Sequence, residues 1–306
     1  KIYLLDIDHD SNLFEYRQSL ENDKKIEFIN CDVRKKIEWS PDEEIDIIFN
    51  FAAVHREPGH KDIEYFETNI KGAENVCEFA DRISCNNIVF SSSISPYGAD
   101  TRVKSEKSLT VPTTAYGSSK LAAEYIHKIW HNNEDKQLII LRPGVVFGPT
   151  EGGNVSRLIR AVKGGYFFFM GNKNLKKAGI YVKEIPHIID WALDKLEEED
   201  INFALLNLTM HPCPTLEDYV NTIKKVGNYQ RTIFSLPTGL IMLIAYITQF
   251  ILGPFVKNNP FNPIRVEKLS RPNEIEPLYL KENKYNFKYN LEEALQDWIN
   301  EYSKEW

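Results

Sequence analysis

Tyr116 and Lys120 form the sequence pattern with the clearest chemical meaning in this chain of 306 residues. Their spacing predicts a helix from Tyr116 to about Asn132, on which residues four apart share one face. A lysine ammonium beside a phenol favours the phenolate and lowers the tyrosine pKa from its ordinary value of about 10. Lowering that pKa to neutrality takes about 4 kcal/mol, so a second positive charge is needed, such as an oxidised nicotinamide ring. The pair suits general acid and base catalysis on a carbinol hydroxyl.

Composition restricts the classes of partner. Hydrophobic residues make up 42% of the chain and charged residues 26%, as in a globular protein, and the net charge is −7. This acidic balance argues against nucleic acid as a partner, because phosphate contacts require basic patches. The cysteines lack the paired spacing of metal and redox motifs, so we expect reduced thiols, no metal site and a cytoplasmic protein. They are Cys31, Cys77, Cys85 and Cys213.

Short apolar strands alternate with helical patterns in the first half of the chain. Repeated strand–helix units predict an α/β fold with a doubly wound parallel sheet. Ligands of such sheets bind at the carboxyl ends of the strands, where Asp6, Asp32, Ala52, Ser93 and Pro143 all fall. The expected strands are Ile2–Asp6, Lys25–Val33, Ile45–Ala53, Asn87–Phe90 and Leu138–Leu141, with a helix at Asp62–Ile83.

The second half carries an uncharged stretch, Thr232–Val256. Prolines and glycines limit its helix to roughly 14 residues, which is short for a bilayer. The pattern favours a buried or ligand-covering helix, and a contact of residues 238–256 with a membrane surface or a partner is the less favoured alternative. Other expected elements are a helix at Val155–Val162, a strand at Ala204–Leu208, a capping box beginning at Thr215 and a helix at Asn290–Trp306.

Three motifs in this order carry a family resemblance: Val-Phe-Ser-Ser-Ser-Ile-Ser-Pro-Tyr-Gly at 89–98, Tyr-Gly-Ser-Ser-Lys at 116–120 and Leu-Arg-Pro-Gly at 141–144. Together they resemble the extended short-chain dehydrogenase/reductase family, in particular its NAD-dependent nucleotide-sugar epimerases and dehydratases. The resemblance spans nearly the whole chain.

The resemblance implies a Rossmann-type NAD-binding domain at 1–145, to which 177–209 returns. A smaller α/β substrate domain would consist of 146–176 and 210–306. The family opens with a strand and a G-x-x-G-x-x-G loop that holds the cofactor pyrophosphate, and this sequence shows no such loop. We therefore expect the natural chain to carry roughly 25–35 further residues ahead of Lys1, an expectation that the gene sequence would test.

The resemblance also implies residue roles. Tyr116 would be the catalytic acid/base, Lys120 would hold the nicotinamide ribose and tune Tyr116, and Ser93 would hydrogen-bond the reacting oxygen. A carboxylate at Asp6 accepts ribose hydroxyls and repels a 2′-phosphate, which favours NAD over NADP. The implied cofactor contacts are Asp6, Asp32, Val33, Phe51, Ala52, Ala53, Asn69, Ser91, Tyr116, Lys120 and Pro143. For the substrate diphosphate the candidates are Asn154 and Arg271, with Arg157 and Arg265 in second place.

The residues after Ser93 narrow the reaction that the resemblance implies. Ile94-Ser95 stands where dehydratase relatives carry an acid, and no cysteine stands where a fucose-synthase-like enzyme would use one. We therefore expect epimerisation of a nucleotide-diphospho-sugar through a 4-keto intermediate, by a homodimer. Two alternatives stay open: an NAD(P)-dependent dehydrogenase or reductase of a hydroxysteroid-like or other hydrophobic alcohol, and a non-catalytic NAD-binding protein.

Overall fold

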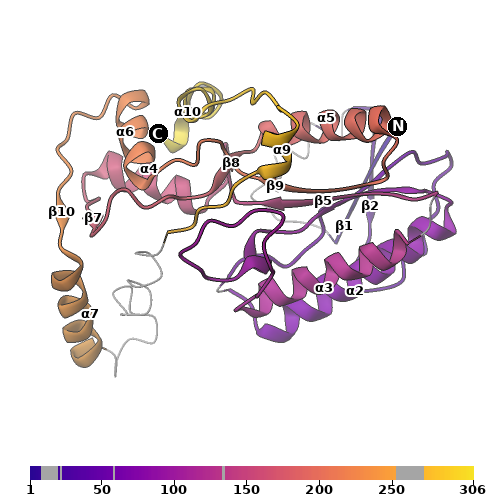
Figure 1. The fold of residues 1–306 in the computed structure, drawn as a ribbon, viewed down its shortest axis with the longest axis horizontal. Helices are drawn as coiled ribbons and strands as arrows, with labels where there is room; N and C mark the ends of the chain where they lie inside the picture. Colours follow the sequence, from indigo (N-terminus) through magenta and orange to yellow (C-terminus); the bar gives the residue numbers. More distant parts are fainter. Residues whose placement is uncertain (8–19, 21–22, 58, 133–134, 253–271) are drawn as a thin grey trace. The chain divides into compact units, whose positions relative to one another are not determined.

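The computed structural model describes residues 1–7, 20, 23–57, 59–132, 135–252 and 272–306 (Figure 1). The chain divides into two compact units. The first unit consists of 1–98, 109–142 and 195–205, and the second of 99–108, 143–194 and 206–306.

The first unit is built on parallel strands joined by crossover helices. Strand β1 (Ile2–Asp6) pairs in parallel with β2 (Ile26–Asn30), and Ile2 lies opposite Ile26. A second sheet has the strand order β3-β4-β5-β9, with β3, β4 and β5 mutually parallel. Its strands are β3 (Ile48–Asn50), β4 (Asn87–Ser91), β5 (Gln137–Pro143) and β9 (Phe203–Leu208). The expected α/β fold with parallel sheets is confirmed.

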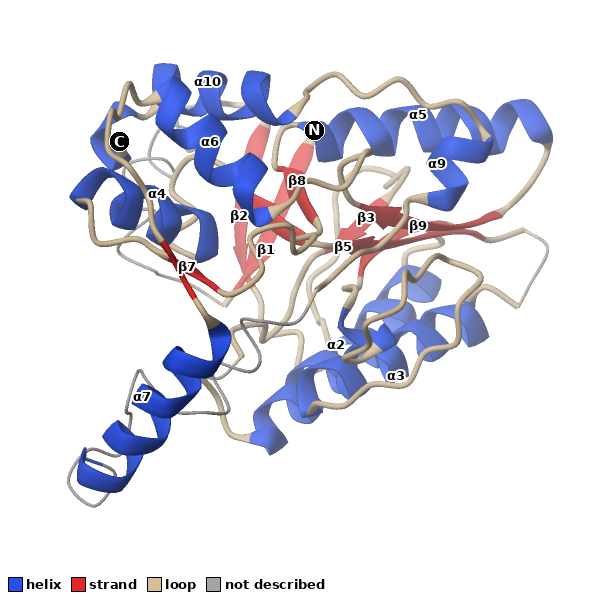
Figure 2. Ribbon diagram, turned by 60° about the vertical axis from the view of Figure 1, so that its left-hand side comes forward, coloured by secondary structure: helices blue, strands red, loops and turns tan. Residues whose placement is uncertain are grey.

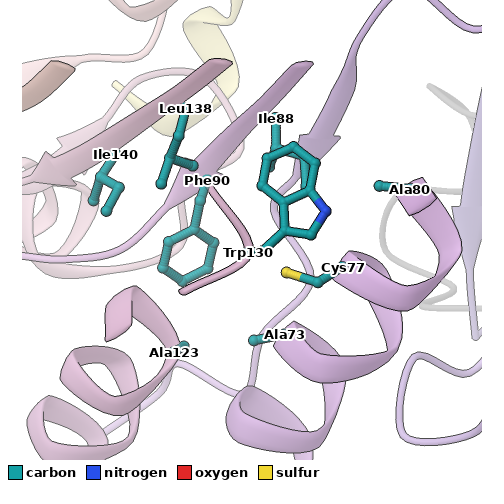
Figure 3. Close-up of a cluster of buried hydrophobic side chains, with 9 residues drawn as sticks. All are labelled: Ala73, Cys77, Ala80, Ile88, Phe90, Ala123, Trp130, Leu138 and Ile140. Carbon is teal, nitrogen blue, oxygen red and sulfur yellow. The ribbon is translucent and has the colours of Figure 1, made fainter. Parts of the chain in front are cut away.

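Helices α2 (Asp62–Arg82) and α3 (Ala115–Trp130) cover one face of the four-stranded sheet (Figures 2 and 3). Small residues on the helices, Ala73 and Ala123, are 1% and 0% exposed and let the helices approach the sheet closely. Burying each large side chain stabilises the fold by about 1.5–3 kcal/mol. The core cluster consists of Ala73, Cys77, Ala80, Ile88, Phe90, Ala123, Trp130, Leu138 and Ile140.

Helix α2 also contacts the two-stranded sheet. Val76 and Phe79 pack with Leu5 of β1 and with Ile48 of β3. Within the described residues the two sheets share no hydrogen-bonded strand pair. Side-chain packing on α2 therefore joins them.

The second unit contains two short parallel strand pairs. Strand β6 (Val145–Phe147) pairs with β8 (Gly179–Tyr181), and β7 (Phe169–Met170) pairs with β10 (Ser235–Leu236). Its other elements are α4 (Asn154–Gly164), α6 (Leu216–Val226), α7 (Thr238–Leu252), α9 (Leu278–Glu282) and α10 (Leu291–Glu301), while α5 (Glu184–Glu199) begins in this unit and ends in the first. Single-turn 3-10 helices lie at Ser95–Tyr97 and Ser303–Glu305.

Most expected elements are present, some with ends shifted by a few residues, as in β2, which covers Ile26–Asn30 of the expected Lys25–Val33, and with three further differences. The capping box at Thr215 is confirmed, because its side chain and that of Asp218 bond each other's backbone N–H. The strand expected at Ile45–Ala53 is only three residues long, since the Val54 backbone bonds the Asn69 side chain instead of a neighbouring strand. The tail helix ends at Glu301 and gives way to a 3-10 turn.

The third difference concerns the uncharged helix α7. We expected a buried or ligand-covering helix, yet only one side of it is buried, and Leu243 and Tyr246 are 56% and 60% exposed. Within the described part of the chain, every helix is too short or too polar to cross a bilayer.

Candidate active site

A serine turn follows the carboxyl end of β4. The Ser93 side chain is buried, and its Oγ accepts a hydrogen bond from the Ser95 backbone N–H at 3.1 Å. The same Oγ lies 3.1 Å from the Ser95 hydroxyl. These contacts fix the Ser93 hydroxyl at the edge of the sheet where ligands of α/β folds bind.

The N-terminus of α3 is fixed by a cap. Thr114 accepts a hydrogen bond from the Gly117 backbone N–H at 3.1 Å and donates to the Glu57 carboxylate at 3.0 Å. Such a cap satisfies a backbone N–H that the first helical turn leaves unpaired. Tyr116 therefore stands in a defined first turn.

Gly117 holds this first turn against the serine turn. A Cβ at Gly117 would lie 2.7 Å from the Ser95 carbonyl oxygen. Alanine normally stabilises a helix by about 1 kcal/mol relative to glycine, but here its methyl group would push the first turn of α3 away from the serine turn. We expect Gly117→Ala to lower both the free energy of unfolding, by about 1–2 kcal/mol, and the kcat. Thermal unfolding and steady-state kinetics would test this, with Ser118→Ala as the control; a stabilised variant of unchanged kcat would contradict it.

The Tyr116 side chain is partly buried, and desolvation of the phenolate raises its pKa, while the nearby Ser93 hydroxyl opposes that rise. The ring lies 5.9 Å from the ring of Tyr65. The sequence led us to expect Lys120 to lower the Tyr116 pKa. In the protein alone the pKa is raised instead, because desolvation of the phenolate outweighs the other contributions, and the combined effect of Lys120 and an oxidised nicotinamide ring stays a prediction.

Lys120 lies one turn further along α3, and its side chain is only 2% exposed. Its ammonium donates to the Ser91 carbonyl oxygen at 2.7 Å and lies 4.9 Å from the centre of the Phe90 ring. Burial lowers the pKa of Lys120 to about 7. Lys120 can therefore change its charge near neutral pH.

A buried ion pair supports this part of α3. Glu124 is 0% exposed, and its carboxylate accepts hydrogen bonds from Arg142 Nε at 2.8 Å and from Arg142 Nη2 at 2.6 Å. Its Oε1 also accepts from the Ser92 hydroxyl at 2.5 Å. Since Glu124 lies on α3, Arg142 on β5 and Ser92 directly after β4, three elements that surround the site meet at one carboxylate.

His127 is a second buried titratable group on α3. Its Nδ1 lies 2.7 Å from the Ala123 carbonyl oxygen and its Nε2 lies 3.2 Å from the Asn50 amide nitrogen. These partners suit the neutral imidazole, with Nδ1 donating and Nε2 accepting. The ring also stacks on Phe90 at a centroid distance of 4.1 Å. Burial lowers the pKa of His127 to about 4.

This low pKa predicts acid sensitivity. Below pH 6.5 the unfolded chain binds a proton at His127, whereas the folded chain binds it only near pH 4. The free energy of unfolding therefore falls as the pH falls through this window. Between pH 7 and pH 5 the loss due to His127 is about 2 kcal/mol. We expect His127→Gln to be less stable at pH 7 but to lose less stability on acidification, as urea unfolding at both pH values would show. An unchanged pH dependence would refute the assignment.

Asn69 holds the loop after β3 against α3. Its amide oxygen accepts from the Val54 N–H at 2.9 Å, and its amide nitrogen donates to the Ser119 hydroxyl at 2.9 Å. The Ser119 hydroxyl in turn donates to the Tyr116 carbonyl oxygen at 2.8 Å. The structure thus gives Asn69, a predicted cofactor contact, a positioning role for the backbone around Tyr116.

The other predicted cofactor contacts of the first unit lie at carboxyl ends of strands. Asp6 ends β1 and is exposed, and its carboxylate accepts from the Ile7 N–H at 2.7 Å. The Asp32 carboxylate is paired with the Arg34 guanidinium at 2.8 Å, which holds the Asp32 pKa below its usual range. Val33 accepts from the Asn75 amide through its carbonyl oxygen at 2.6 Å.

These residues suit a dinucleotide. Phe51 is 55% exposed beside the small side chains of Ala52 and Ala53, which leave room for a flat ligand. A buried ammonium at Lys120 and an exposed carboxylate at Asp6 supply a donor and an acceptor for ribose hydroxyls. Within the described residues no cluster of histidine, cysteine, aspartate and glutamate is arranged to hold a metal ion.

The predicted substrate residues belong to the second unit. Asn154 is the first residue of α4, and its side-chain oxygen accepts from Arg157 Nη2 at 2.7 Å. Pro143, which was predicted as a cofactor contact, is the last residue of β5. Arg271 and Arg265 lie outside the described residues.

Comparison with known proteins identifies the fold and the family. The model of the NAD dependent epimerase/dehydratase family matches residues 4–204, more than half of the chain. The chain belongs to this family. The predicted family and the predicted NAD-dependent epimerase/dehydratase type of enzyme are thereby confirmed.

Two curated relatives illustrate the range of substrates among family members. The N-acetyl-alpha-D-glucosaminyl-diphospho-ditrans,octacis-undecaprenol 4-epimerase of Escherichia coli O157:H7 is 26% identical over 252 residues, which are 82% of this chain and 75% of that enzyme. UDP-glucose 4-epimerase 2 of Arabidopsis thaliana is 26% identical over 215 residues, or 61% of each chain. The chain thus matches less than two thirds of the plant enzyme.

Solved structures share the fold of this chain. The UDP-Glc/GlcNAc 4-epimerase of Campylobacter jejuni has a TM-score of 0.71 at 19% identity and covers 98% of this chain and 92% of its own. The UDP-glucuronic acid 4-epimerase of Bacillus cereus in complex with NAD has a TM-score of 0.71 at 18% identity, with coverages of 98% and 90%.

Proposed function

We propose that this protein inverts carbon 4 of a diphosphate-linked sugar through a 4-keto intermediate, with NAD as cofactor. The observation that carries the proposal is the arrangement on α3. Tyr116 stands in the first turn of α3 near Ser93, whose hydroxyl opposes the rise of the Tyr116 pKa, and the buried Lys120 follows one turn later, with its ammonium 2.7 Å from the Ser91 carbonyl.

The side chains have distinct roles in this proposal. The Tyr116 oxygen takes the proton of the sugar hydroxyl. It returns the proton after the 4-keto sugar has rotated to present its opposite face. The Ser93 hydroxyl orients the reacting oxygen, and Lys120 stabilises the phenolate and holds the nicotinamide ribose. Asp6 and residues 51–53 would hold the rest of the cofactor. NAD supplies the hydride acceptor at carbon 4 and the hydride donor for the opposite face.

Two relatives support the proposed substrate class. The E. coli relative acts on a sugar carried by undecaprenyl diphosphate, and the Arabidopsis relative is a UDP-glucose 4-epimerase. We propose a lipid-linked diphospho-sugar as the substrate, because the E. coli enzyme matches the larger share of this chain. Asn154, Arg157 and Arg271 are the proposed diphosphate contacts. A homodimer through α2 and α3 is also proposed, supported by Tyr125 and Ile129 on α3, which are 56% and 75% exposed.

Deuterium at carbon 4 of the sugar tests the mechanism. We expect purified protein with NAD to convert the labelled UDP-sugar or lipid-linked sugar to its 4-epimer with the deuterium retained, since the hydride leaves and returns. Nicotinamide released on denaturation should be oxidised and near one per chain. Net formation of reduced nicotinamide with a 4-keto product would favour a dehydrogenase instead. Loss of the label to solvent would exclude the hydride mechanism.

A further inference from the structure

Helix α7 (Thr238–Leu252) is apolar on two opposite sides. Ile241 and Ala245 are 3% and 0% exposed and pack against the strands β7 and β10 through Met170 and Leu236. The opposite side carries four exposed large apolar side chains at helical spacing, which we call the α7 face. They are Leu240, Leu243, Tyr246 and Ile247, between 45% and 60% exposed.

This face departs from the usual pattern of a surface helix, whose exposed side is polar. Phe234, just before the helix, is a further exposed apolar residue, at 71%. No charged residue occurs from Thr232 to Val256, and the preceding Arg231 donates to the Gly164 carbonyl. A contiguous exposed apolar patch of this kind marks an interaction site.

We infer that the α7 face docks on the hydrocarbon of a lipid bilayer, with the helix lying in the plane of the membrane surface. This inference rests on the proposed function with a lipid-linked substrate. A polyprenyl carrier stays in the bilayer, because every methylene group gains free energy there. An enzyme that acts on its diphospho-sugar headgroup must therefore work at the membrane surface. At 15 residues α7 is too short to span the bilayer and long enough to lie on it.

The charge pattern specifies the mode of binding. Peripheral helices that use basic residues require anionic lipids and lose affinity as salt screens the attraction. The α7 face contains only hydrocarbon and aromatic side chains, so its binding should need no anionic lipid and should withstand salt. A neutral membrane is therefore the most informative probe.

Flotation of the purified protein with phosphatidylcholine vesicles tests the inference. We expect the wild-type protein to float with the vesicles, equally at about 0.1 M and about 0.5 M salt. The variant Leu243→Glu/Ile247→Glu should bind at least tenfold more weakly. The matched control Val103→Glu/Leu109→Glu places two carboxylates at positions 51% and 83% exposed outside α7 and should float like the wild type.

Several results would overturn the inference. Folded wild-type protein that stays unbound would do so, as would equal flotation of wild type and the α7 variant. The wild-type protein could also form a dimer without binding vesicles. If the α7 variant were then monomeric, a second copy of the chain would be shown to cover the face. Binding of dispersed polyprenol without vesicle binding would assign the face to the substrate tail.

Activity on a soluble UDP-sugar separates this inference from the proposed function. The α7 variant should keep that activity, because α7 carries none of the proposed catalytic residues. Flotation without any epimerisation would reject the proposed function and leave the membrane contact standing. Epimerisation without flotation would reject the membrane contact alone.

Discussion

Replacing Tyr116 by phenylalanine is expected to lower kcat by about 100-fold to 10,000-fold, the range lost when a positioned acid/base is removed. The substitution deletes one hydroxyl group and keeps the ring that lies 5.9 Å from Tyr65. Stability should therefore change little, and NAD should still bind. Steady-state kinetics with the deuterated sugar, together with the nicotinamide content of the variant, would measure both effects.

Tyr65→Phe is the matched control. The Tyr65 side chain is also aromatic and is 2% exposed, and its hydroxyl donates to the Arg56 carbonyl oxygen at 2.5 Å. Removing it should lower kcat less than tenfold. If Tyr116→Phe kept wild-type kcat, the non-catalytic alternative or a different base would replace our mechanism.

Removing the Glu124 carboxylate should strongly destabilise the first unit. Glu124→Leu leaves the 3% exposed Arg142 guanidinium without its partner and the Ser92 hydroxyl without its acceptor. Breaking a buried ion pair by removing one partner costs about 3–5 kcal/mol. Because Glu124 raises the Lys120 pKa, the variant should also have a Lys120 of lower pKa. Chemical denaturation and the pH profile of kcat would report the two effects.

A double-mutant cycle separates the ion pair from packing. The double variant Glu124→Leu/Arg142→Met should recover most of the lost stability, since an apolar pair of similar volume leaves no buried charge. Glu199→Gln removes a surface carboxylate 2.8 Å from Lys195 and should cost less than about 1 kcal/mol. If Glu124→Leu and Glu199→Gln lowered the free energy of unfolding equally, burial would not increase the contribution of the Glu124–Arg142 pair to stability.

The elements and the family could be predicted because local patterns carry them. Alternating strands and helices indicated the parallel sheet, and the capping-box residues indicated where α6 begins. The predicted strand at Ile2–Asp6 matches β1 in both bounds. The positions of Ser93, Tyr116 and Lys120 followed from their spacing and from motif resemblance, while their roles stay predictions.

The buried polar residues that hold the site in place could not be predicted from the sequence in the same way. Ser119, Glu124, His127 and Arg142 are polar residues that sequence patterns place on surfaces. Their burial and pairing depend on contacts between elements distant in the chain, such as Glu124 with Arg142. The i+4 spacing of Lys120 and Glu124 was the one local signal, since it places both on the face of α3 that carries Tyr116. The rise of the Tyr116 pKa in the protein alone could not be predicted for the same reason, because sequence does not report desolvation.

The side-chain junction between the two sheets of the first unit has a consequence for hydrogen exchange. Strands β1 and β2 bond only each other within the described residues, whereas β5 lies between β4 and β9. Opening the β1–β2 ladder therefore breaks its own hydrogen bonds and its packing on α2 and Trp39 but leaves the hydrogen bonds of the larger sheet intact. We expect amides of Tyr3–Leu5 to exchange at least about tenfold faster than those of Ile139–Leu141, as a separate cooperative unit of lower opening free energy. The adenosine end of the proposed cofactor site would then be the part that ligand binding protects most.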